Sequence, residues 1–230
     1  MDRYFSETPL VTRAAITLEG SEAHHLSRVM RVSVGEQVEL FDGLGSQFIA
    51  EITEVRKNEV ALLVTEEQQV DRELPCPLTI AVALPKGERQ KWLVEKLVEL
   101  GVTELIPIVT ERSVVQPNDK AVKRLQRGVI EASKQCRRNR LMMVGDVRTW
   151  NEIVADDSLA TQRVIAHPYG DSAVTNLEAE PALVAVGPEG GFTDAEVKQA
   201  TSSGWRVLNL GPRILRVETA AIACAARRQT

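Results

Sequence analysis

Residues 182–196 read ALVAVGPEGGFTDAE. The apolar run Ala182–Val186 is typical of a strand buried in a parallel sheet. A glycine-rich turn follows, and Thr193 with Glu196 has the Thr-x-x-Glu spacing of a capping box that begins a helix. Because ligands of parallel α/β sheets bind at the carboxyl ends of strands, the turn predicts a binding pocket. A tight turn without a ligand is the alternative. The patterns for dinucleotides (G-x-G-x-x-G) and triphosphates (G-x-x-x-x-G-K-[ST]) do not occur in this loop.

A second strand ends in the same way further along the chain. Residues 208–220 read LNLGPRILRVETA, again with Gly-Pro after an apolar run. Taken alone, Arg213 and Arg216 are typical of surface charges, and Glu218 suits the first turn of a helix without any function. Two Gly-Pro strand ends in one domain predict a shared pocket lined by backbone.

The pattern of predicted strands and helices divides the chain into two domains. Residues 1–72 predict a small barrel or sheet, and residues 73–230 alternate strand and helix as in an α/β domain with a parallel sheet. Between them, Gln68–Pro77 is polar and carries two prolines, as linkers do. In the first domain we expect strands at Glu36–Phe41, Gln47–Thr53 and Val60–Thr65, and a helix at Ser21–Arg31 capped by Ser21. In the second we expect strands at Leu78–Leu84, Glu104–Val109, Arg163–His167, Ala182–Val186 and Arg206–Leu210, and helices at Glu88–Leu100, Lys120–Cys136, Thr193–Ser203 and Glu218–Arg228.

Composition narrows the class of protein. Of the 230 residues, 43% are hydrophobic and 26% charged, which indicates a globular fold rather than disorder. The three cysteines form no C-x-x-C pair, so we expect no metal site and a reducing, cytoplasmic location. No apolar run reaches the roughly 18 residues that a membrane span needs, so no membrane association is expected.

Positive charge is concentrated in one segment. The whole chain has a net charge of −4, yet Lys120–Arg140 holds eight basic residues and one acid, Glu131. This bias predicts a polyanion as partner, whereas the solvated face of an ordinary amphipathic helix is the alternative. The segment's candidate phosphate-binding residues are Arg124, Arg127, Lys134, Arg137 and Arg138.

The two Gly-Pro motifs resemble those of a known family. GPEGGFTDAE (187–196) and LGPRILRVETA (210–220) are similar to the RsmE family, SPOUT-class methyltransferases of uracil N3 in small-subunit (16S) ribosomal RNA. The resemblance covers nearly the whole chain. Supporting matches are KGERQKWLVEKLVELGV (86–102), EASKQCRRN (131–139), His167-Pro168 and HHLSRVMRVSVGEQVELFDG (24–43).

The resemblance implies a fold and a set of partners. It implies a PUA-like RNA-binding β-barrel at residues 1–72, an α/β domain with a trefoil knot at 73–230, and a homodimer. The methyl donor would be S-adenosyl-L-methionine, without a metal, and the substrate would be one uridine in the decoding region of 16S rRNA in the small ribosomal subunit. Arg28 and Arg31 would add RNA contacts. The donor pocket would be lined by His167, Val186, Gly187, Pro188, Gly190, Leu210, Gly211, Leu215 and Arg216.

Methylation of uracil N3 sets requirements on the catalytic residues. The N3 proton must leave, and N3 lies on the pairing edge, so the base must be unpaired or flipped. We expect Arg216 to stabilise the developing negative charge, and Glu218 or Glu189 to take the proton or to hold loops in place. Two other functions are considered: a non-enzymatic RNA-binding or ribosome assembly factor with a knotted fold, and a related methyltransferase acting on tRNA or on a ribose 2′-hydroxyl.

Overall fold

The computed structural model describes residues 1–169 and 180–228. The chain folds into two compact units. The N-terminal unit comprises Met1–Glu73 and Ser133–Leu141, and the C-terminal unit comprises Leu74–Ala132 and Met142–Thr230. The sequence predicts a single boundary between residues 72 and 73, and it does not anticipate that residues 133–141 return to the N-terminal unit.

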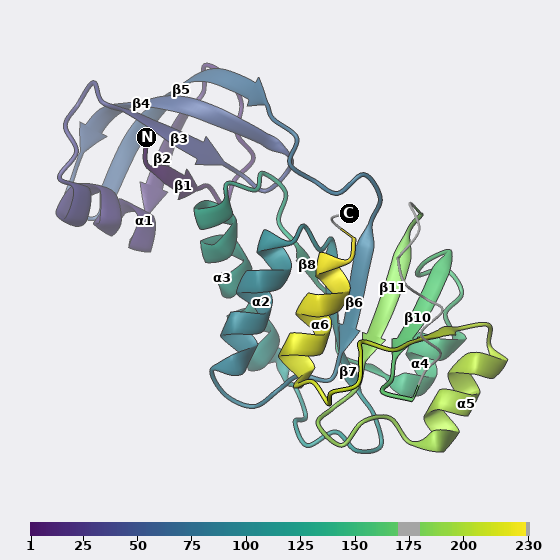
Figure 1. Cartoon of the computed structure of the whole chain (residues 1–230). Helices are drawn as coiled ribbons and strands as arrows, with labels where there is room; N and C mark the ends of the chain where they lie inside the picture. The colour runs from purple at the N-terminus through teal and green to yellow at the C-terminus, as the bar shows by residue number, and fades with distance from the viewer. Residues whose placement is uncertain (170–179, 229–230) are drawn as a thin grey trace. The chain divides into compact units, whose positions relative to one another are not determined.

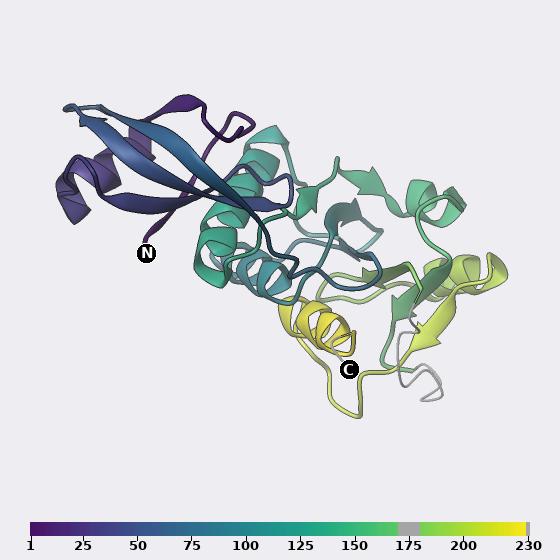
Figure 2. The same cartoon turned by 90° about the horizontal axis from the view of Figure 1, so that it is seen from above.

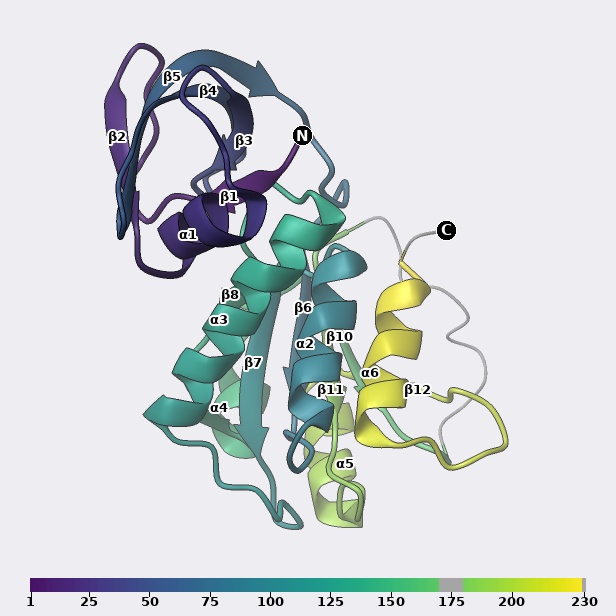
Figure 3. The ribbon, with the colours of Figure 1, turned by 90° about the vertical axis from the view of Figure 1, so that its left-hand side faces the viewer.

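The N-terminal unit is a curled five-stranded sheet (Figures 1 and 3). The strand order is β1-β3-β4-β5-β2, with β3, β4 and β5 paired antiparallel in the predicted meander and β1 parallel to β3. Alternate residues of the three central strands, such as Leu40, Ile52 and Leu62, point into one apolar core. The strands are β1 (Arg3–Phe5), β2 (Ala15–Glu19), β3 (Gln37–Phe41), β4 (Ser46–Val55) and β5 (Glu59–Gln69).

The helix predicted at Ser21–Arg31 has two parts in the structure. A short α-helix, α1 (Gly20–His24), continues as a π-helix, η1 (His25–Met30). Its N-cap is Glu19, not Ser21, and Glu19 makes no side-chain capping bond. Tertiary packing therefore holds this segment, since Ala23 and Leu26 are fully buried in the core of the unit.

The C-terminal unit contains the predicted parallel sheet. Its order is β12-β10-β11-β6-β7-β8, with β9 also paired to β7, and every pair is parallel. The central strands β6 and β11 are buried at every residue, as their continuous apolar runs predict. The strands are β6 (Leu78–Val82), β7 (Glu104–Val109), β8 (Met143–Val144), β9 (Arg148–Thr149), β10 (Gln162–Ala166), β11 (Ala182–Val186) and β12 (Arg206–Leu208).

Helices cover both faces of this sheet (Figures 1 and 2). α2 and α6 pack side by side over β6 and β11. On the other face α4 and α5 cover a core that includes Trp150, Phe192 and Trp205. α4 was not predicted, although Thr149 begins it with a capping box to Glu152. The trefoil knot stays a prediction. The helices are α2 (Arg89–Glu99), α3 (Asp119–Cys136), α4 (Trp150–Ala155), α5 (Asp194–Ser202) and α6 (Val217–Ala226).

Candidate functional site

A cavity of about 340 Å³ lies in the C-terminal unit, beyond the carboxyl ends of β10, β11 and β12. Three loops form most of its walls: one begins at His167 after β10, the second is 187–194 after β11, and the third is 210–215 after β12. The start of α6 contributes Val217 and Ala220. The cavity therefore lies where ligands of parallel α/β sheets bind.

The loop after β11 is held by its own residues. A Cβ atom on Gly187 would lie 2.9 Å from the ring of Phe192, so only glycine fits there. Phe192 is 3% exposed and packs against Trp150, with 4.6 Å between ring centroids. The Gly191 amide donates to the Pro188 carbonyl oxygen at 2.8 Å, and Gly191 has a φ of 69°. These contacts hold the loop in the conformation that forms the cavity wall.

The capping box predicted at the start of α5 is confirmed. Thr193 Oγ1 accepts from the Glu196 amide, and Glu196 Oε2 accepts from the Thr193 amide at 2.8 Å. Glu196 also binds a backbone amide outside the helix: its Oε1 accepts from the Glu111 amide, in the loop after β7, at 2.9 Å. The carboxylate thus connects the glycine-rich loop to the neighbouring loop of the same sheet edge.

The loop after β12 is tied to the loop after β10. The His167 amide donates to the Leu208 carbonyl oxygen at 2.9 Å, and Asn209 Nδ2 donates to the Pro168 carbonyl oxygen at 3.0 Å. Asn209 Oδ1 also accepts from the Gly211 amide at 2.7 Å, and Gly211 has a φ of 109°, a value that favours glycine. The two predicted Gly-Pro turns therefore face the same cavity.

Most of the predicted donor-binding residues line the cavity, but Arg216 does not. Arg216 is the exposed N-cap residue of α6 and is not among the residues that line the cavity, so its place in the pocket wall stays a prediction. The predicted residues that line the cavity are His167, Val186, Gly187, Pro188, Gly190, Leu210, Gly211 and Leu215.

The two predicted proton acceptors differ in burial. Glu189 is exposed on the cavity wall, whereas Glu218 is 3% exposed in the first turn of α6 and does not line the cavity. Both form ion pairs with Arg89, at 3.0 Å for Glu189 and 3.6 Å for Glu218. Each carboxylate is therefore engaged by an arginine that the sequence analysis did not single out.

Several lining residues were not predicted. The Arg112 side chain, from the loop after β7, donates from Nη1 to the Gly190 carbonyl oxygen at 2.9 Å. The signal for it was available: the loop after β7 leaves the same edge of the parallel sheet as the glycine-rich loop. The unpredicted lining residues are Arg112, Ala166, Pro168, Tyr169, Gly191, Phe192, Asp194, Arg213, Ile214, Val217 and Ala220.

His167 is a cavity residue whose pKa is shifted by its surroundings. Burial lowers the pKa of His167 below its usual value, and the nearby Asp194 carboxylate opposes this shift only in part. The ring is therefore neutral at pH 7. Within residues 1–169 and 180–228, no three His, Cys, Asp or Glu side chains come together as metal ligands.

The basic segment is divided between the two units. Arg124 and Arg127 are exposed on α3 in the C-terminal unit, and Arg124 also donates to Gln90 Oε1 at 2.6 Å. In the N-terminal unit, Arg28 and Arg31 are exposed, and Lys134 is ion-paired with Glu22 at 2.7 Å.

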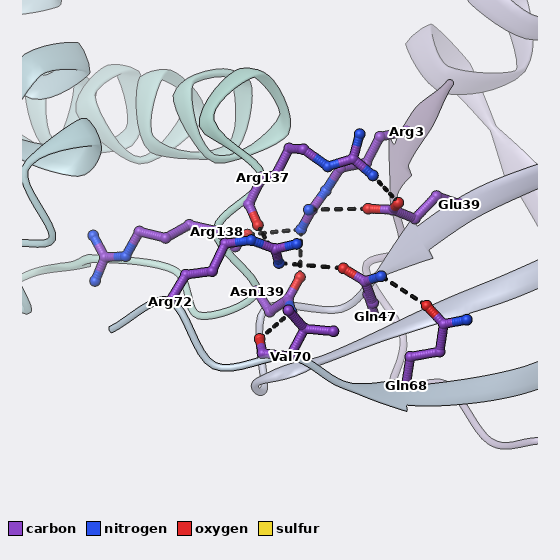
Figure 4. A network of polar contacts seen from close by, with 9 residues as sticks. All are labelled: Arg3, Glu39, Gln47, Gln68, Val70, Arg72, Arg137, Arg138 and Asn139. Carbon is purple, nitrogen blue, oxygen red and sulfur yellow. Dashed lines mark hydrogen bonds and ion pairs between the residues drawn. The ribbon is translucent and has the colours of Figure 1, made fainter. Parts of the chain in front are cut away.

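Arg137 and Arg138 belong to a polar network inside the N-terminal unit (Figure 4). Arg138 is 3% exposed and pairs with Glu73, so the prediction that it binds RNA is not supported: its guanidinium is used inside the fold. Arg137 is exposed but pairs with the buried Glu39, which also pairs with Arg3 at 3.0 Å. Burial lowers the pKa of Arg3 to about 10, opposed by Glu39.

Among the helices that the structure describes, none has the length and apolarity to cross a membrane.

Two family models match the chain: "RNA methyltransferase domain" over residues 72–229 and "RNA methyltransferase PUA domain" over residues 18–65.

Named relatives agree with these models. A protein of Bacillus subtilis named ribosomal RNA small subunit methyltransferase E is 34% identical, covering 96% of this chain and 93% of its own. A solved structure of ribosomal RNA small subunit methyltransferase E from Neisseria gonorrhoeae, bound to S-adenosyl methionine, has a TM-score of 0.90 at 32% identity, covering 100% and 97%. A Legionella pneumophila methyltransferase in complex with SAM also has a TM-score of 0.90, at 30% identity, covering 99% and 96%.

Proposed function

Because this chain belongs to the ribosomal RNA small subunit methyltransferase E family, an RsmE-type SPOUT methyltransferase with a PUA domain, we propose that it methylates N3 of a uridine in 16S rRNA. The methyl donor is S-adenosylmethionine. One observation carries the proposal: the two motifs that define the resemblance line a single cavity at the carboxyl ends of β10, β11 and β12. Uridine N3 and its location in the decoding region come from the resemblance alone.

The cavity suits the proposed donor. Its volume of about 340 Å³ falls within the roughly 300–1,000 Å³ of small-molecule sites. Backbone of the glycine-rich loop and the side chains of Leu210 and Leu215 offer the planar, uncharged adenosine an apolar surface with amides and carbonyls. Arg112 and Arg213 offer cations to a carboxylate, and Asp194 offers an anion to an ammonium group. When bound, S-adenosylmethionine supplies an electrophilic methyl group.

The chain must also deal with the N3 proton and the charge left on the base. Arg216 is exposed and lies in the sequence between the lining residues Leu215 and Val217, which supports a role in stabilising that charge. Arg112 is a second arginine for this task, because it lines the cavity and one donor holds the Gly190 carbonyl. Glu189, which lines the cavity, is better placed than the buried Glu218 to accept a proton.

RNA binding and assembly complete the proposal. Exposed Arg124 and Arg127 would contact phosphates, with Arg28 and Arg31 adding contacts from the N-terminal unit. We propose a homodimer, which two large exposed apolar side chains beside the cavity support: Tyr169 is 88% exposed and Ile214 is 76% exposed. Such an enzyme would work in the cytoplasm, where its ribosomal substrate is located.

The test is transfer of a labelled methyl group to four substrates: assembled small subunits, naked 16S rRNA, tRNA, and synthetic RNA with 2′-deoxyuridine replacing uridine. Digestion of the product to nucleosides identifies the methylated atom. The proposal expects N3-methyluridine from the small-subunit substrates. Label in tRNA alone, or on a ribose oxygen, would favour the related methyltransferase. If calorimetry detects no binding of the donor while the protein binds RNA tightly, the assembly factor is favoured.

A further inference from the structure

Arg89 connects two of the structural elements that surround the cavity. It is the first residue of α2, and its guanidinium contacts carboxylates from two other elements. Nη2 lies 3.0 Å from Oε1 of Glu189, in the loop after β11, and Nη1 lies 3.6 Å from Oε2 of Glu218, in the first turn of α6. Glu189 belongs to one wall of the cavity, and α6 continues directly from the wall formed by residues 210–215.

Glu218 depends on this arginine for its charge balance. Its side chain is 5% exposed, and Oε2 makes no hydrogen bond with any residue that the structure describes. At 3.6 Å the contact with Arg89 is too long for a hydrogen bond, so the attraction between opposite charges remains. A buried carboxylate that loses its cation is strongly unfavourable, and the helix dipole at the start of α6 compensates for it only in part.

Removal of Arg89 would therefore act on both walls at once. Glu189 would lose its ion pair, and Glu218 would be left buried without a cation. The two carboxylates lie against one guanidinium, so without it they would also repel each other. The start of α6 would have to shift to hydrate Glu218, and residues 210–215 precede it directly.

We propose that Arg89 is a positioning residue that fixes the distance between two walls of the donor cavity, the glycine-rich loop and residues 210–215. The inference rests on the proposed function, because it takes S-adenosylmethionine as the ligand of this cavity. Arg89 does not line the cavity itself, so it acts through Glu189 and Glu218 rather than by touching the donor. The pairing also gives the buried Glu218 a structural role in place of proton transfer.

The experiment is a double-mutant cycle read by calorimetry of S-adenosylmethionine binding, with urea unfolding of each variant in parallel. Arg89→Gln is expected to raise the Kd roughly tenfold, and Arg89→Lys, which keeps the charge, to raise it much less. Glu218→Gln is measured alone and combined with Arg89→Gln; the combination removes the unpaired buried carboxylate and should restore most of the affinity. Arg148→Gln is the matched control, since Arg148 forms a 3.0 Å ion pair with Asp156 away from the cavity.

Each outcome decides the inference. Recovery in the Arg89→Gln/Glu218→Gln double variant supports positioning through Glu218. Additive losses would overturn it and would indicate that Arg89 contacts a ligand directly. A change in unfolding midpoint without a change in Kd would also overturn it, as a purely structural effect. Failure of the wild type to bind the donor would contradict the proposed function instead, so the two failures are distinguishable.

Discussion

Arg138 and Glu73 form a bidentate ion pair in the N-terminal unit, with Nε 3.0 Å from Oε1 and Nη2 2.5 Å from Oε2. Arg138 is 3% exposed, so the pair is largely withdrawn from water. The Arg138 carbonyl oxygen accepts from Arg3 at 2.7 Å, and Asn139 Nδ2 donates to the Val70 carbonyl oxygen at 2.8 Å. Residues 133–141 are thus a structural part of the curled sheet's unit.

The first prediction concerns this pair. Arg138→Gln should destabilise the protein by about 3 kcal/mol, because it leaves Glu73 without its cation in a mostly buried site. Arg138→Met combined with Glu73→Met should recover much of the loss, since neither charge then remains. Urea unfolding followed by circular dichroism measures both. Arg56→Gln, whose ion pairs with Glu54 and Glu59 are exposed, is the control and should leave the unfolding midpoint unchanged. An equally small effect of Arg138→Gln would contradict the assignment.

The features that the sequence predicted correctly depend on residues that are close together in the chain. The apolar run Ala182–Val186, the Thr193 capping box and the Gly-Pro turns are local features, and the structure contains each of them. The site residues that the patterns missed depend on contacts between distant segments. Arg112 reaches Gly190 across 78 positions, and Arg138 pairs with Glu73 across 65. The run of cations indicated a polyanion surface, although three of its members, Lys134, Arg137 and Arg138, pair with acids within the fold.

The second prediction distinguishes two neighbouring glycines. Gly187→Ala would place a Cβ 2.9 Å from the Phe192 ring, which Trp150 holds in place. We expect a loss of about 1–3 kcal/mol in stability, and weaker donor binding as the loop moves. Gly190→Ala is the matched control, because its Cβ would lie 3.4 Å from the flexible stem of Arg112. Calorimetry and urea unfolding of both variants test this difference. Equal effects at the two positions would show that the Phe192 contact is unimportant.

The third prediction follows from the lowered pKa of His167. Because burial favours the neutral ring, the folded-state pKa lies below the unfolded value of about 6.5. The stability that His167 contributes is therefore present above about pH 6.5 and is lost as the pH falls through the folded-state pKa. NMR titration of the imidazole should give this lower value. In His167→Asn the unfolding free energy should fall less steeply between pH 7 and 5. A titration midpoint above that of a free histidine would contradict the burial argument.

The fourth prediction uses Tyr4, which is 1% exposed in the core of the N-terminal unit. Burial, with smaller contributions from Asp2 and Glu22, raises the pKa of Tyr4 to about 12. Because the protonated phenol is favoured in the fold, its stabilisation is complete below about pH 10 and is lost as the pH rises through about 12. The chain has two tyrosines, so Tyr169→Phe leaves one to titrate. Absorbance at 295 nm should then rise near pH 12, or together with unfolding. A rise near pH 10 while the fold is intact would be inconsistent with this burial.

The last prediction concerns RNA binding by the basic face of α3. Arg127 is exposed, and no ion-pair partner for it occurs among residues 1–169 and 180–228, so its charge is available for a phosphate. Arg127→Gln should weaken binding to 16S rRNA and lower the slope of log K against log salt by about one, the effect of one lost phosphate contact. Arg148→Gln is the control: it also removes one positive charge, but from an ion pair with Asp156, and it should leave the slope unchanged. Charge reversal at Arg137 and Arg138 would be a poor test, because both pair with acids inside the N-terminal unit and the variant would report misfolding. If Arg127→Gln retains the wild-type slope, the α3 face does not bind the RNA backbone at this position.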